Sequence, residues 1–379
     1  MGEGRYRALL CLVQVAVDDG AGGTQVEVLD PLEGFEPAEL RDVLADPAIE
    51  IVVHAGRQDV AILRRTWSTD VRNLFDTQVA AGFAGHGAQT GYGPLLADVL
   101  GRRLAKSASF TRWDRRPLSD EQVRYAREDV ADLLELAAVL QDELRAAGRL
   151  DWAREECRAL EDSTDERDPL EAWRRLPRVS RLRPRERAVA RELAAWRERT
   201  AASEDRPVGS VISDPALVEL ARRQPSDRKG LDQIRGLHGR IASRRGDELL
   251  AAIARGREAE PPELDGARPP LNEASDSPLI ALAEALIRAR ALESGLAYEL
   301  VATRADLNRV IAAARRGDAE PEVRTLQGWR RDLVGAELLE LLDGRHALAV
   351  QRTAERSPSL RVVAIDGGCQ GGRAEPDPD

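Results

Sequence analysis

The order of hydrophobic and polar positions predicts mixed strands and helices in the first 80 residues. Apolar residues run nearly unbroken over 8–17 and alternate with polar ones over 24–29, with turn-forming residues between them. This pattern predicts a β-hairpin with a long loop. Helical spacing over 36–46 predicts a helix, and the β-branched run 49–53 predicts a short buried strand that leads into a second helix. The order is that of an α/β domain.

Helical periodicity dominates the remainder of the chain. The clearest predicted helices cover 95–100 and 120–144, and two longer helical segments cover 183–258 and 275–347. Charged and proline-rich stretches separate these regions. From this pattern, together with the resemblance given below, we expect four parts: a domain over 1–165, helical domains over 178–260 and 272–348, and a flexible tail over 349–379. The tail has at most a short strand at 361–365.

Composition narrows the class of protein. The 379 residues are 42% hydrophobic, which is enough for packed cores. No apolar run approaches the roughly 20 residues of a membrane-spanning helix, and no secretory signal is recognisable. We therefore predict no membrane partner and a cytoplasmic protein. Cys11, Cys157 and Cys369 are too widely spaced for a disulfide framework or a zinc site, and are predicted to be reduced bystanders.

The net charge of −10 conceals two basic segments. Residues 174–191 contain eight arginines and one acidic residue, and residues 222–245 contain eight basic and two acidic residues. Two interpretations stay open: phosphate-binding surfaces or solvated helix faces. Trp173, Trp196 and Trp329 likewise allow two interpretations, base-stacking platforms or core residues.

Two short segments contain the candidate chemistry. The first is His54-Ala55-Gly56-Arg57-Gln58-Asp59, whose aspartate follows the carboxyl end of a predicted buried strand, where open α/β sheets bind ligands. The second is Tyr125-Ala126-Arg127-Glu128-Asp129, in which Tyr125 and Asp129 share one helix face. Such oxygen ligands suit Mg²⁺ or Mn²⁺. The alternative is that Asp59 is an ordinary first-turn acid and the other two a surface pair.

The segment from Ile51 to Arg158 resembles the ribonuclease D family of the DEDD superfamily of 3′-to-5′ exonucleases. HAGRQD, LFDTQVAA, KSASFTRWDRRPLS and YAREDVADLL carry the resemblance, in this order. Residues 193–253 resemble the helicase-and-ribonuclease-D C-terminal (HRDC) domain, and the second helical segment looks like a diverged copy. The resemblance implies an α/β ribonuclease-H-like exonuclease domain followed by two all-α HRDC-like domains.

The resemblance also implies function and site residues. The implied reaction is two-metal hydrolysis of phosphodiesters at RNA 3′ ends, such as those of tRNA precursors, with two Mg²⁺ or Mn²⁺ ions. Asp59 and Asp129 would bind metal, and Tyr125 would orient the attacking water. Lys106, Arg116 and Arg235 are candidates for contact with nucleic acid. The sequence leaves the oligomeric state and the choice between RNA and DNA undetermined.

One motif of the resembled family is missing. An Asp-x-Glu on the first, central strand should precede residues 8–17, yet only Met1 to Arg7 lies there. We therefore expect the domain to be incomplete, with the first strand absent and catalysis by this chain impaired. Two explanations stay open: a start site placed too late, or a catalytically inactive nucleic-acid-binding adaptor.

Overall fold

The structure is a computed structural model that describes residues 4–104, 112–263, 273–318, 321–353 and 356–365. The chain divides into two compact units. The first unit comprises Met1–Thr77, Val99–Val139 and Glu156–Ala267, and the second comprises Gln78–Asp98, Leu140–Glu155 and Arg268–Asp379. Each unit is described by itself.

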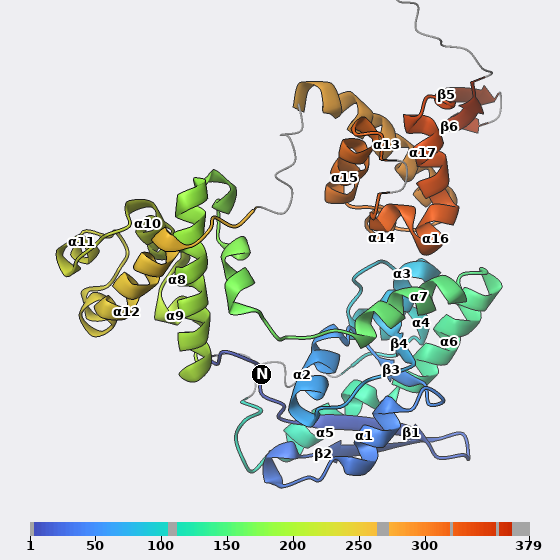
Figure 1. Cartoon of the computed structure of the whole chain (residues 1–379). Helices are drawn as coiled ribbons and strands as arrows, with labels where there is room; N and C mark the ends of the chain where they lie inside the picture. The colour runs from blue at the N-terminus through green and yellow to red at the C-terminus, as the bar shows by residue number, and fades with distance from the viewer. Residues whose placement is uncertain (1–3, 105–111, 264–272, 319–320, 354–355, 366–379) are drawn as a thin grey trace, which may run out of the picture. The chain divides into compact units, whose positions relative to one another are not determined.

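Two short strand pairs form the β structure of the first unit (Figure 1). Strands β1 (Val13–Asp18) and β2 (Thr24–Leu29) are antiparallel, with Asp18 opposite Thr24, as the sequence predicts for a hairpin. Strands β3 (Ile51–Val53) and β4 (Leu74–Asp76) are parallel. Among the described residues, no ladder joins β1–β2 to β3–β4, so these are two separate sheets.

Helices accompany each strand pair. Helix α1 (Ala38–Ala45) precedes β3, and α2 (Arg57–Trp67) follows it. Helix α5 (Asp120–Ala131) packs against β1 and β2, and a capping box between Ser119 and Gln122 fixes its start. The predicted single helix over 120–144 is interrupted at Asp132, after which α6 (Leu133–Ala146) begins. Because Asp132 alone departs from helical geometry, the helical spacing of hydrophobic residues continues from α5 into α6. The sequence pattern therefore does not reveal the break.

The remainder of the first unit is helical. Trp173 and Trp196 are 0% and 8% exposed, so the structure favours core residues over base-stacking platforms for both. Gly256 of α12 allows a close approach to α8, because a Cβ there would lie 2.5 Å from the Val189 Cα. Helix α7 (Leu150–Glu161) begins in the second unit and continues into the first from Glu156. The other elements are η2 (Pro169–Arg175), η3 (Val179–Arg181), α8 (Pro184–Ser203), α9 (Val208–Val211), α10 (Asp214–Arg223), α11 (Arg228–Asp232) and α12 (Gly239–Glu258).

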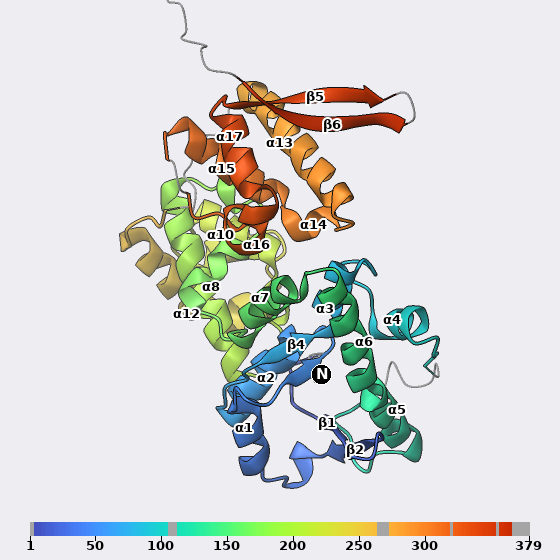
Figure 2. The same cartoon turned by 90° about the vertical axis from the view of Figure 1, so that its right-hand side faces the viewer.

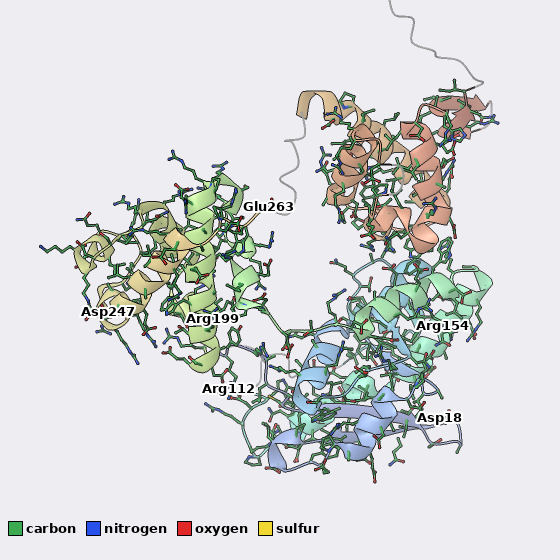
Figure 3. All side chains as sticks on the ribbon, in the orientation of Figure 1. Asp18, Arg112, Arg154, Arg199, Asp247 and Glu263 are labelled. Carbon is green, nitrogen blue, oxygen red and sulfur yellow. The ribbon has the colours of Figure 1, made fainter. Side chains whose placement is uncertain are left out.

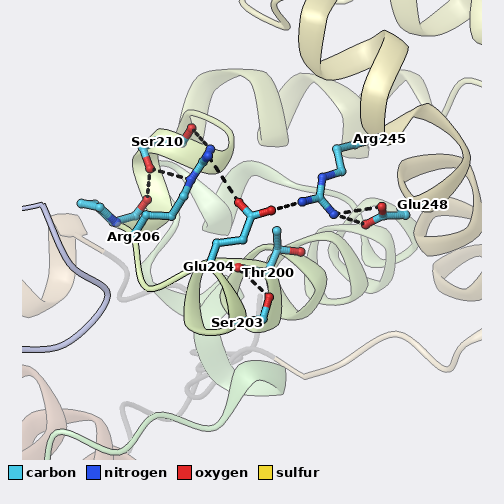
Figure 4. Close-up of polar contacts among 8 residues, drawn as sticks. Thr200, Ser203, Glu204, Arg206, Ser210, Arg245 and Glu248 are labelled. Carbon is cyan, nitrogen blue, oxygen red and sulfur yellow. Dashed lines mark hydrogen bonds and ion pairs between the residues drawn. The ribbon is translucent and has the colours of Figure 1, made fainter.

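An ion-pair network closes the C-terminal end of α8 (Figure 4). Glu204, the C-cap residue, accepts from Arg245 of α12 and pairs with Arg206 at 3.3 Å. Arg245 also donates to Glu248 at 3.0 Å. The network fixes α12 against the end of α8 through charge-assisted hydrogen bonds.

A tryptophan cluster forms part of the core of the second unit. Trp329 is 2% exposed, stacks on Trp152 at 5.3 Å between ring centroids and meets the edge of Phe83 at 4.9 Å, so it too is a core residue. The elements that begin in this unit or at its border are α3 (Thr77–Ala84), α4 (Tyr92–Val99), α13 (Glu273–Glu293), α14 (Tyr298–Val301), α15 (Arg304–Arg315), η4 (Arg324–Leu326), α16 (Gly328–Arg330), η5 (Arg331–Gly335) and α17 (Ala336–Leu342).

The C-terminal part of the second unit differs from the sequence expectation. Strands β5 (His346–Thr353) and β6 (Arg356–Ala364) form an antiparallel hairpin, seen along its length beside α13 in Figure 2. The sequence predicted a tail with at most a short strand here. Strand β5 packs against α17. Packing against a helix gives a two-stranded hairpin the support that it lacks alone.

Candidate active site

Asp59 lies in the first turn of α2, after the tight turn that joins β3 to this helix. In that turn Ala55 has a left-handed backbone with φ of 54°, and a Cβ on Gly56 would lie 2.5 Å from the Val53 Cγ2. Although Asp59 keeps an exposed surface, the surrounding protein desolvates its carboxyl, and this effect, with the charge of Asp76, raises its pKa.

A buried carboxylate supports this turn. Asp76, at the end of β4, is 1% exposed. Its two oxygens accept the backbone N–H groups of Ala55 at 3.0 Å and Gly56 at 2.8 Å. The neighbouring Thr77 hydroxyl donates to the Val53 carbonyl at 3.1 Å and therefore accepts from the Nδ1 of His54 at 2.9 Å. His54 is thus part of the turn, at the start of the helix.

Tyr125 and Asp129 lie on one face of α5, and the structure brings their side chains together as the i, i+4 spacing predicts. The Tyr125 hydroxyl is hydrogen-bonded to the Asp129 carboxylate. Burial and the nearby charge of Glu128 raise the pKa of Asp129 to about 6, although the Tyr125 bond opposes the shift. Burial, the Asp129 charge and the same bond raise the pKa of Tyr125.

The two carboxylates have the right chemistry for a divalent cation but do not complete a site. In the described part of the chain, no lysine or arginine forms an ion pair with Asp59 or Asp129. Nor do three potential metal-binding side chains come together anywhere in that part. Mg²⁺ takes near-octahedral oxygen coordination, so these residues fit as part of a donor set.

Arg116 is fully engaged within the first unit. Its Nε and Nη2 donate to the two oxygens of Asp30, Nη2 also donates to the Cys11 carbonyl at 2.9 Å, and Nη1 donates to the carbonyls of Trp113 and Arg115. An arginine has five N–H donors. All five are used, so the structure favours a structural role for Arg116 over phosphate contact.

The other two candidates for nucleic-acid contact have different outcomes. Lys106 lies outside the described residues. Arg235 is exposed in the loop between α11 and α12. Some neighbouring basic side chains are neutralised, such as Arg228, which pairs at 2.7 Å with Asp247 (labelled in Figure 3). The exposed basic residues of this segment that form no ion pair within the described residues are Arg222, Lys229, Arg235, Arg240 and Arg244.

Two further residues stand apart from the candidate set. The sequence favours a bond from Asp76 to the backbone of a neighbouring turn over metal contact, and the structure confirms this bond, to the turn before Asp59. The available signal was an aspartate at the end of a buried strand beside β3. His86 showed no ligand spacing, yet its ring bridges Asp98 and Glu143 in the second unit.

No helix of the described residues is long and apolar enough to cross a membrane.

Comparison with known proteins identifies the two regions. Residues 2–145 match the family described as 3′-5′ exonuclease, and residues 186–253 match the HRDC domain. Ribonuclease D of Granulibacter bethesdensis is 37% identical over 358 residues, which cover 92% of this chain and 87% of that protein. Ribonuclease D of Gluconacetobacter diazotrophicus is 38% identical over 360 residues, covering 93% and 88%.

A solved structure agrees over nearly the whole chain. The crystal structure of Escherichia coli RNase D, an exoribonuclease involved in structured RNA processing, superposes with a TM-score of 0.78 at 28% identity and covers 90% of each chain. An exonuclease domain therefore precedes an HRDC domain here. The chain belongs to the ribonuclease D family and is a 3′-to-5′ exoribonuclease.

Proposed function

We propose that Asp59, Tyr125 and Asp129 form the part of the hydrolytic site that this chain supplies. The observation that carries the proposal is the pair of desolvated carboxylates without described cationic partners, one of them bonded to a tyrosine hydroxyl. Desolvation of a carboxylate without a neutralising partner is costly. A bound divalent cation would offset that cost.

Each residue then has a defined task. Asp59 and Asp129 hold Mg²⁺ or Mn²⁺, of which two ions are expected, and the metal supplies Lewis-acid and water-activating chemistry. The Tyr125 hydroxyl, close to Asp129, orients the water for attack on the terminal phosphodiester. Because a phenol stays protonated far above neutral pH, it gives this hydrogen bond without competing for the metal.

We further propose that the site is completed by a strand carrying Asp-x-Glu between β1 and β3. The separation of β1–β2 from β3–β4 supports this, since one strand inserted there would join two small sheets into one. Buried ladder groups would then gain partners, each worth about 1 to 3 kcal/mol if otherwise left unsatisfied. The polypeptide 1–379 alone is therefore expected to hydrolyse RNA poorly.

The proposed substrate is the 3′ end of RNA, including tRNA precursors, and the cytoplasm stays the proposed compartment. The exposed basic residues around Arg235 support a role of residues 178–260 in holding RNA through phosphate contacts. Residues 272–348 are proposed as a second, diverged HRDC-like domain, after the exonuclease domain over 1–165 and before the end segment 349–379.

The test compares 1–379 with a fusion that adds an Asp-x-Glu strand before residue 1, on 5′-labelled RNA in Mg²⁺. The fusion should shorten the RNA from its 3′ end. Asp59→Asn and Asp129→Asn should each lower kcat by at least 100-fold with RNA binding intact, whereas the control Asp120→Asn, at an exposed residue of the same helix as Asp129, should not. Full activity of both site variants would refute the assignment.

The alternative is a binding adaptor without catalysis. The exposed basic residues of the α10–α12 region that form no ion pair within the described residues are compatible with it too, because phosphate contact does not require catalysis. The adaptor predicts salt-dependent RNA binding by 1–379, and no hydrolysis by the fusion in either Mg²⁺ or Mn²⁺. Hydrolysis by the fusion would exclude it.

A further inference from the structure

The turn between β3 and α2 has a conformation that its own sequence does not favour. Ala55 has φ of 54°, a left-handed backbone that a residue with a Cβ adopts only at a cost. Gly56 follows in close contact with Val53, where no side chain fits. Asp59 lies three residues after Gly56, within the first turn of α2, so the turn at Ala55–Gly56 sets the direction of this part of the helix.

A distant residue holds this conformation. The Asp76 carboxylate, buried at 1% exposure, accepts from two successive backbone N–H groups, with one oxygen on Ala55 and the other on Gly56. Two adjacent N–H groups at a helix N-terminus attract an anion. Here the anion belongs to the protein itself, 20 residues along the chain.

Further contacts hold Asp76 itself in place. Asp76 lies opposite Val53 in the parallel pair of β3 and β4, and its own N–H donates to the Cys157 Sγ at 3.2 Å. Thr77 adds a second connection between β4 and the turn, because its hydroxyl is hydrogen-bonded to both the Val53 carbonyl and the His54 ring. The carboxylate therefore has a fixed position from which to hold the turn.

We propose that Asp76 is a positioning residue of the exonuclease site. Its carboxylate fixes the left-handed turn at Ala55–Gly56 and thereby the direction in which Asp59 is presented to the divalent cation that it is proposed to hold. This inference rests on the role proposed above for Asp59. A displacement of about 1 Å at a reacting centre can cost about 100-fold in rate, so loss of the carboxylate should affect catalysis more than substrate binding.

The main variant is Asp76→Asn in the full chain carrying the added Asp-x-Glu strand. An amide has one acceptor oxygen, so its NH₂ would face a backbone N–H and one of the two bonds would be lost. Hydrogen exchange of the Ala55 and Gly56 amides should rise at least about tenfold, and kcat should fall about 10- to 100-fold at unchanged KM. The Mg²⁺ concentration for half-maximal rate should also increase.

The matched control is Glu161→Gln, another acid-to-amide change in contact with β4. The Glu161 carboxylate accepts the Leu74 N–H at 3.1 Å, at the far end of the same strand. The Glu161→Gln substitution should leave the amide hydrogen exchange of residues 55 and 56 unchanged, and likewise the kcat. An equal effect of both variants on kcat would reduce Asp76 to general support of β4 and overturn the proposal.

A rescue experiment separates positioning from simple loss of packing. Glycine accepts φ of 54° without strain, so Ala55→Gly in the Asp76→Asn background should restore part of the lost kcat. If Asp76→Asn fails to fold, Asp76→Glu keeps the charge and shifts the carboxylate by one methylene. Unchanged kcat and exchange in that variant would overturn the proposal.

The outcomes also distinguish this inference from the site assignment. An inactive Asp59→Asn together with a fully active Asp76→Asn would overturn the positioning role alone. Full activity of both variants would refute the assignment of Asp59, and the positioning role with it. In that case, faster exchange at residues 55 and 56 would still show that Asp76 holds the turn.

Discussion

Arg116 and Asp30, 86 residues apart in sequence, form a two-point ion pair in which Nε and Nη2 donate to the two carboxylate oxygens. Both side chains are partly shielded, with 16% and 24% exposure. Hydrogen bonding by Arg116 is the main effect that lowers the pKa of Asp30. The pair joins the loop before α5 to the end of β2, next to the strands that α5 covers.

Arg116→Lys should lower the free energy of unfolding by about 1 to 3 kcal/mol, although the charge is retained. A lysine reaches from a single nitrogen and cannot replace five donors in a planar fork. Urea denaturation measures the change. Arg115→Lys, at an exposed neighbour whose side chain has no described partner, should be nearly neutral. Equal effects of the two substitutions would contradict the structural role of Arg116.

His86 should make stability depend on pH. Its Nδ1 and Nε2 lie 2.6 Å from Asp98 and 2.8 Å from Glu143. Burial lowers its pKa, but the bonds to Glu143 and Asp98 outweigh burial, and the net shift is upward from 6.5. A raised folded pKa means that the protonated ring stabilises the fold fully below about pH 6.5, and that this contribution is lost as the pH rises through the folded value.

His86→Gln should therefore lower the free energy of unfolding by about 1 kcal/mol at pH 6, a modest amount because these charged groups are partly exposed. The loss should be clearly smaller at pH 9, where the ring is neutral. Urea denaturation at the two pH values measures the difference. His238→Gln, at an exposed histidine before α12, is the control and should change the free energy of unfolding little. A loss that is the same at both pH values would argue against a charged His86.

Cys157 should be unreactive in the folded chain. Its thiol is 0% exposed, and burial raises its pKa to about 12, so almost no thiolate forms near neutral pH. Iodoacetamide at pH 8, followed by peptide mass spectrometry, should label Cys157 at least about 100-fold more slowly in the native than in the urea-unfolded chain. Native labelling at the unfolded rate would mean that α7 does not hold the Cys157 thiol against the end of β4.

Arg235 should contribute to RNA binding through phosphate contact. Arg235→Ala should weaken binding to single-stranded RNA and lower the slope of log affinity against log salt by about 0.7 to 0.9. Arg223, which is already bonded to Glu219 on its own helix, is the matched control and should change the slope less when replaced by alanine. Fluorescence anisotropy over a salt series measures both. Identical slopes for Arg235→Ala and the parent chain would exclude the contact.

The features that the sequence determined are local ones. Alternation and turn residues gave the β1–β2 hairpin, the β-branched run gave β3, and the i, i+4 spacing brought Tyr125 to Asp129. In each case the partners lie within a few residues or across one turn, so the periodicity of a single element fixes the contact. The motif order likewise identified the family, because it depends on linear sequence alone.

Tertiary structure decided what depends on distant partners. Asp76 holds a turn 20 residues away. Arg116 uses all its donors, and its partners include Asp30, 86 residues away, and the Cys11 carbonyl, 105 residues away. The sequence shows an acid and a base at these positions, without showing whether each faces solvent, substrate or a buried turn. The role of each side chain depends on which backbone groups lie next to it. Packing of the strands places those groups there, and so only the folded chain defines the role.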